Sequence, residues 1–128
     1  MDAEGYRSHP YRCTANKLTI GYGRNLEDNG ISREEGKFLL ANDLADVALY
    51  TAGIDYFDRL DPVRQLVVSD MVYNLGAVRF GWFRKFNAAL AIGDYTLAAH
   101  EMMDSKWYTQ VGRRAKKLRE AMITGIWK

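Results

Sequence analysis

The chain has 128 residues, of which 48% are hydrophobic and 27% are charged, and these values exclude a disordered or fibrous protein and predict one domain. One cysteine, Cys13, excludes an internal disulfide framework and a cysteine-rich zinc module. The net charge of +2 does not by itself indicate a class of partner.

We expect no targeting signal in the first residues of this sequence. Residues 1–4 lack the charged and apolar regions of a signal peptide, and no apolar run approaches the about 18 residues of a membrane span. We therefore expect synthesis in the cytoplasm.

Residues 5–31 predict a small β-rich lobe. Leu18–Gly23 is rich in β-branched and aromatic side chains, and the region contains several glycines. We expect two or three short antiparallel strands, with a tight turn at residues 15–17.

Helical signals follow from Ser32 onward. Ser32 and Glu35 form a capping box at the start of a connecting helix, residues 32–52. Residues 53–128 predict a helical lobe, in which Asp61 caps an apolar central helix over 62–75. Further helices are expected over about 84–92, after Asp94 and after Gly112. The fold class is therefore α+β.

The last expected helix is strongly basic. Residues 106–128 carry seven basic side chains and one acidic, whereas residues 1–105 carry 11 basic and 15 acidic. This end predicts either a solvated helix face or a contact with an anionic partner such as lipid headgroups or a bacterial envelope. A nucleic-acid-binding protein would be basic over more of its length, so we expect no nucleic acid partner.

Several kinds of active site are not supported by the sequence. His9 and His100 belong to no shared motif, so we expect no metal site. The segment Gly21–Gly23 lacks the remaining residues of a phosphate-binding loop. Cys13 has no evident base partner for a cysteine hydrolase.

One spacing does indicate chemistry. Eight residues separate Glu4 from Cys13, and five separate Cys13 from Thr19. Glutamate, aspartate or cysteine, and threonine at these intervals resemble the active site of the phage-type lysozymes.

The resemblance extends along nearly the whole chain. Leu18–Gly23 is similar to the "TIGYG" signature, and other pieces occur in the family's order: Glu4–Tyr6 with Tyr11–Cys13, Gly30–Ser32, Met71–Gly76, Ser105–Tyr108 and Gly112–Arg114. The resemblance implies a two-lobed lysozyme-like fold in residues 1–128. It also implies a muramidase, needing no cofactor, that hydrolyses the β-1,4 bond between N-acetylmuramic acid and N-acetylglucosamine in peptidoglycan.

The resemblance assigns catalytic roles to three residues. Glu4 would donate a proton to the glycosidic oxygen, Cys13 would act as a base or as a nucleophile, and Thr19 would position water or Cys13. Arg114 would orient Glu4.

Substrate-binding and supporting roles follow from the same resemblance. Gly23, Tyr73 and Asn74 are candidate substrate contacts, and Asn74 is polar within an otherwise apolar helix. Arg24 stands where relatives often carry histidine, and we expect it to pair with Asp43 across the lobes.

The sequence leaves alternative functions open. One is a relative with weakened catalysis that binds peptidoglycan, because Cys13 replaces the more common aspartate and only three residues precede Glu4. Another is a protein that binds a membrane or envelope through residues 112–128. We expect a monomer that reaches the cell wall, in the periplasm, after release from the cytoplasm.

Overall fold

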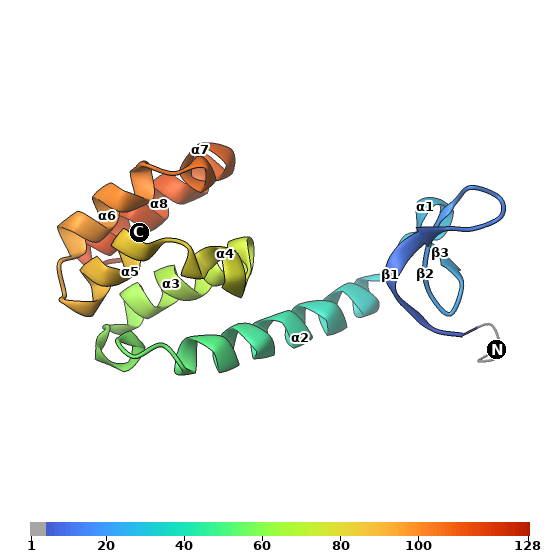
Figure 1. Cartoon of the computed structure of the whole chain (residues 1–128), viewed down its shortest axis with the longest axis horizontal. Coiled ribbons are helices and arrows are strands. Elements are labelled where there is room, and N and C mark those ends of the chain that lie inside the picture. Colours follow the sequence, from blue (N-terminus) through green and yellow to red (C-terminus); the bar gives the residue numbers. More distant parts are fainter. Residues whose placement is uncertain (1–4) are drawn as a thin grey trace. The chain divides into compact units, whose positions relative to one another are not determined.

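A computed structural model describes residues 5–128, which form two compact units that divide between Ala41 and Asn42 (Figure 1). The N-terminal unit contains a small antiparallel sheet, and the C-terminal unit is helical. The α+β class predicted from the sequence is confirmed.

The sheet has three strands in the order β1 (Arg7–Arg12), β2 (Leu18–Gly21) and β3 (Arg24–Asn25). Strands β1 and β2 are joined by a tight turn in which Asn16 has a φ of 62°, a conformation that asparagine tolerates better than most residues. Gly23 lies in the turn between β2 and β3 with a φ of 90°, where a side chain would be strained. The predicted hairpin is therefore confirmed.

The short helix α1 (Leu26–Asn29) follows the sheet, and the long helix α2 (Arg33–Ala52) begins after it. The Ser32 hydroxyl accepts the backbone N–H of Glu35 at 3.0 Å, and the Glu35 carboxylate accepts the backbone N–H of Ser32 at 2.8 Å. This reciprocal pair is the capping box predicted from the sequence.

The C-terminal unit is built around α3 (Pro62–Leu75), with Asp61 as its N-cap. The remaining elements are the 3-10 helix η2 (Phe57–Arg59) and the helices α4 (Ala77–Gly81), α5 (Arg84–Ala91), α6 (Tyr95–Met103), α7 (Lys106–Val111) and α8 (Arg113–Thr124). Asp94 caps α6, as its position predicts.

The core of this unit forms around α3. Its residues Val67, Val68 and Met71 are fully buried, and apolar side chains from α5, α6 and α8 pack in the same cluster. Phe80 and Phe86 meet edge to face, with ring centroids 6.0 Å apart. The side of α8 that carries Ala115, Leu118 and Met122 is buried, so its basic side chains lie on other sides.

The sequence did not predict η2, α1, α4 or α7, which are all between three and six residues long. Elements of one or two turns carry too little periodicity to be recognised in a sequence. In residues 5–128, no helix is both long enough and apolar enough to cross a membrane.

Candidate active site

Glu4, the predicted proton donor, lies outside the described residues. The other candidates are described within their own units. Cys13, Thr19, Gly23 and Arg24 belong to the N-terminal unit, and Asp43, Tyr73, Asn74 and Arg114 belong to the C-terminal unit.

Cys13 and Thr19 lie at one end of the β1–β2 hairpin. Cys13 directly follows β1, and its backbone N–H donates to the carbonyl of Lys17 at 3.0 Å across the turn. Thr19 is in β2, the middle strand, where it pairs with Tyr11 on one side and Asn25 on the other. Pairing on both sides holds the Thr19 backbone, and its side chain is buried.

The Cys13 thiol is half-buried, and its pKa is lowered from the ordinary value. The main cause is a hydrogen bond from the backbone of Lys17, and the second is a hydrogen bond from the Thr19 side chain. Both favour the thiolate, which is the nucleophilic and basic form of cysteine. The two residues of the predicted pair thus interact, and their surroundings favour the reactive thiolate form of Cys13.

The Thr19 hydroxyl has one hydrogen to donate. It donates to the Lys17 carbonyl at 2.8 Å, and it lies close enough to the Cys13 sulfur to lower the pKa of the thiol. We expect the hydroxyl to turn toward the sulfur when the thiol ionises, because a charged acceptor forms the stronger hydrogen bond.

Glu27 in α1 braces the same hairpin, a role that the sequence did not predict. Its Oε1 accepts from the backbone N–H of Leu18 at 3.1 Å and from Nη1 of Arg12 at 2.9 Å. Leu18 and Arg12 are opposite each other in the sheet and are adjacent to Thr19 and Cys13. One carboxylate therefore holds together the two strand residues that adjoin Cys13 and Thr19.

Arg24 forms a two-pronged ion pair with Glu35 and also donates to the carbonyl of Gly30 at 3.1 Å. The pKa of Glu35 is lowered to about 2, first by the hydrogen bond from Arg24 and then by the Ser32 backbone N–H. Gly23 and Arg24 line a groove of about 960 Å³ in the N-terminal unit. The expected pairing of Arg24 with Asp43 would join the two units and stays a prediction.

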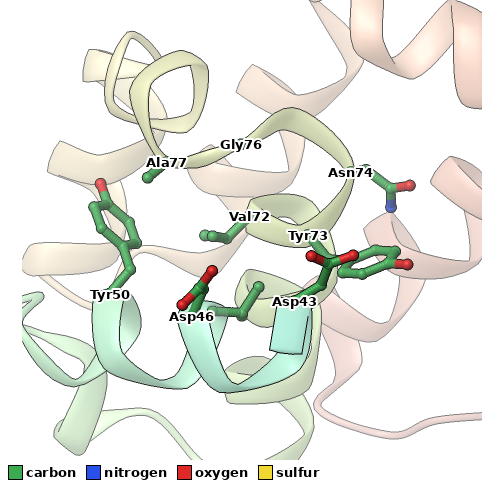
Figure 2. Close-up of a pocket in the computed structure, with 9 residues that line it drawn as sticks. Asp43, Asp46, Tyr50, Val72, Tyr73, Asn74, Gly76 and Ala77 are labelled. Carbon is green, nitrogen blue, oxygen red and sulfur yellow. The ribbon is translucent and has the colours of Figure 1, made fainter. Parts of the chain in front are cut away.

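Asp43, Tyr73 and Asn74 line one pocket of about 530 Å³ in the C-terminal unit (Figure 2). Its walls are the second half of α2 and the C-terminal end of α3, followed by Gly76 and Ala77. Carboxylates, a phenol ring and an amide thus face a shared hollow, a mixture that suits hydrogen bonding and stacking with a sugar.

Arg114, at the start of α8, pairs with Asp70 in the middle of α3. Its Nε donates to Asp70 Oδ1 at 3.2 Å, and its Nη2 donates to Oδ2. Asp70 also accepts from Asn74. Asp70 was not predicted from the sequence, although a carboxylate four residues before a polar side chain on an apolar helix is a recognisable signal.

Comparison with known proteins places this chain in a family. The model of the phage lysozyme family matches residues 1–121. The chain belongs to the phage lysozyme family. This membership confirms the resemblance drawn from the motifs.

A curated relative is the pre-baseplate central spike protein Gp5 of Enterobacteria phage T4, which is 29% identical over 117 residues. The match covers 84% of this chain and 20% of the relative. The chain therefore spans about a fifth of the length of this relative.

Proposed function

We propose that this phage lysozyme is a muramidase that cleaves the β-1,4 bond between N-acetylmuramic acid and N-acetylglucosamine in bacterial walls. We propose that it serves host lysis by a phage or prophage. The observation that carries the proposal is the position of Cys13 and Thr19, two residues of the motif, at the end of one hairpin, where Thr19 lowers the pKa of the Cys13 thiol. Family membership over residues 1–121 supports it.

Glu4 is the proposed general acid. It would donate its proton to the glycosidic oxygen as positive charge develops at the anomeric carbon. Arg114 is the proposed partner that orients it. A guanidinium carries five N–H groups, and Asp70 accepts two of those on Arg114, so three are left for a second carboxylate.

Cys13 is the proposed second catalytic group, and its lowered pKa supports this role because it raises the fraction of thiolate. As a base, the thiolate would take a proton from the attacking water. As a nucleophile, it would bond to the anomeric carbon while the leaving sugar takes the proton of Glu4, and water would then release the product. Thr19 would hold the thiolate in either case.

Tyr73, Asn74 and Gly23 are the proposed contacts to the glycan. The pocket at the C-terminal end of α3 supports the first two, since it combines an aromatic ring with amide and carboxylate groups. Open space in front of the Gly23 backbone supports close approach of a sugar there.

The decisive experiment measures turbidity loss of purified peptidoglycan by the wild type and by Glu4→Gln. We expect the variant to lose at least a hundredfold in rate, because general acid catalysis contributes about 10²–10⁴-fold. Glu120→Gln, an exposed glutamate on α8, is the matched control and should keep the wild-type rate. Equal clearing by wild type and Glu4→Gln would contradict the role of Glu4.

Mass analysis of the released muropeptides separates hydrolysis from other cleavage. A muramidase adds water and leaves reducing sugar ends, whereas a lytic transglycosylase leaves anhydro ends. We expect reducing ends. Peptidoglycan binding without release of fragments would instead support the alternative of a binding protein.

Contact with an anionic envelope surface is a second proposed property. Arg113, Lys116 and Lys117 on α8 are exposed while the apolar face of that helix is buried, so these charges face solvent. They would attract the enzyme to an anionic wall or membrane after its release from the cytoplasm. We propose a monomer, with no nucleic acid partner and no cofactor.

A further inference from the structure

Asp70 joins two of the proposed site residues. Its side chain is 9% exposed, and its Oδ1 accepts from Asn74 Nδ2 at 2.6 Å and from Arg114 Nε at 3.2 Å. Its Oδ2 accepts from Arg114 Nη2. One nearly buried carboxylate therefore holds side chains from α3 and α8 in a single network.

The network determines which way the Asn74 amide faces. Asn74 Nδ2 donates to the Asp70 carboxylate and, at 2.9 Å, to the Asp70 backbone carbonyl. An amide has two N–H donors, and these two acceptors use both. An ionised carboxylate and a carbonyl can only accept, so the reversed amide would place its oxygen against two other oxygens.

Asn74, which lines a pocket together with Tyr73 and Asp43, is thereby left with its carbonyl oxygen to offer a ligand. A residue that is ordinarily both donor and acceptor becomes an acceptor alone. It would bind the donor groups of a sugar, namely a hydroxyl or the N–H of an acetamido group.

We propose that Asp70 is a positioning residue that sets Asn74 as a hydrogen-bond acceptor for a glycan hydroxyl or acetamido N–H. This inference rests on the proposed function, because it assumes that the pocket at Asn74 binds the glycan. Asp70 does not touch the substrate. It acts through Asn74, and its two-pronged pair with Arg114 holds its carboxylate in place.

The first test is a double-mutant cycle with Asp70→Asn and Asn74→Ala, measured as KM and kcat on purified peptidoglycan. The Asp70→Asn substitution introduces an N–H₂ group that can donate to Asn74 and occupy its oxygen. We expect each single variant to raise KM about tenfold, which corresponds to one hydrogen bond. The double variant should be no worse in KM than Asn74→Ala alone.

The control is Asp61→Asn, at the cap of the same helix. Asp61 also pairs with an arginine, Arg64, but its side chain accepts from Arg64 alone among the described residues and, unlike that of Asp70, does not hold a residue that lines the pocket. The control variant should lower the unfolding temperature and leave KM unchanged. If Asp70→Asn lowers the unfolding temperature and leaves KM unchanged, or if the KM effects of the two single variants multiply in the double variant, the inference is overturned.

The wild-type protein offers a second test that depends neither on a folded variant nor on cleavage. In NMR spectra taken during titration with a soluble peptidoglycan fragment, the Asn74 side-chain carbonyl carbon should shift. Its two N–H protons should stay protected from exchange. Loss of that protection on binding, or a carbonyl that does not respond, would overturn the inference.

This design separates the inference from the proposed function. If the wild type releases no fragments but the Asn74 carbonyl responds as expected, then hydrolysis is wrong and the role of Asp70 stands. If fragments are released and the carbonyl does not respond, hydrolysis stands and the role of Asp70 is wrong.

Discussion

At the scale of single residues, the contact between Cys13 and Thr19 bears most directly on the proposed catalysis, because it affects the reactivity of the Cys13 thiol. Thr19 is held in the middle strand, and its hydroxyl can serve either a carbonyl or a thiolate. The reactivity of the cysteine therefore depends on a neighbour that is itself fixed by the sheet.

Replacing Thr19 should change how Cys13 titrates. Thr19→Val removes a hydrogen bond to the thiolate, so the pKa of Cys13 should rise, whereas Thr19→Ser keeps the hydroxyl and should stay close to the wild type. The measurement is the rate of iodoacetamide alkylation against pH. Because the Lys17 backbone contributes more than Thr19, the shift should be partial; identical profiles for wild type and Thr19→Val would contradict the contact.

Residue roles were predictable from the sequence only where a motif specified them. The spacing of Cys13 and Thr19 indicated a pair, and the hairpin brings them together. The spacing could not show that Glu27 braces that hairpin or that Asp70 holds Arg114, because these contacts join residues 9 to 44 positions apart through the folded backbone.

At the scale of elements, helix α2 begins with an ion pair as well as a capping box. Glu35 serves both, since it accepts from the Ser32 backbone and from Arg24. Glu35→Gln could keep the capping contact and would lose the ion pair, so this substitution separates the two contributions.

The stability effect of Glu35→Gln should depend on pH. The pKa of Glu35 is lowered from 4.5 to about 2, so its ionised form stabilises the folded unit above about pH 4.5. That contribution is lost as the pH falls from 4.5 through about 2. Thermal unfolding should therefore show the variant less stable than wild type at neutral pH, with a difference that shrinks toward about pH 2. A constant difference would contradict this assignment.

Arg64 ties two helices together. From α3, its Nε donates to the carbonyl of Met122 at 2.7 Å and its Nη2 donates to that of Ile123 at 2.9 Å, both in the last turn of α8. Its guanidinium also stacks on the ring of Tyr95, 3.8 Å from the centroid. These contacts satisfy helix-end carbonyls that would otherwise lack partners within the helix.

Arg64→Met should lower the free energy of unfolding by about 2 kcal/mol, because it removes charge-assisted hydrogen bonds and leaves partly buried carbonyls without a donor. Arg59→Met is the matched control, since exposed Arg59 makes one long hydrogen bond of 3.3 Å to Ala91. Its effect should stay below about 0.5 kcal/mol. Urea unfolding measures both, and equal losses would contradict the role of Arg64.

The longer helices were predictable, because their capping residues and their hydrophobic periodicity can be read from neighbouring residues in the sequence. Ser32, Asp61 and Asp94 each mark a helix start that the structure confirms. The short helices were not predictable, since their positions depend on how the neighbouring helices pack.

At the scale of the whole molecule, charge is divided along the chain. The tail from residue 106 carries seven basic side chains, but these side chains differ in their contacts. Arg114 is engaged by Asp70, while Lys116 and Lys117 are exposed. Composition could show the excess of charge, and the fold was needed to show which charges are committed to an internal contact.

The exposed part of the tail should control how fast the protein reaches an anionic wall. Lys116→Glu with Lys117→Glu changes the net charge from +2 to −2, and Arg33→Glu with Lys37→Glu makes the same change at exposed positions at the start of α2. Screening acts over about 10 Å at 0.1 M salt, so an attraction by the tail should weaken as salt rises. Clearing of whole cell walls should slow severalfold in low salt for the tail variant, and much less for the α2 variant. Both differences should vanish in high salt. If the two variants slow clearing equally, net charge is what matters, and the tail has no special role as an attracting surface.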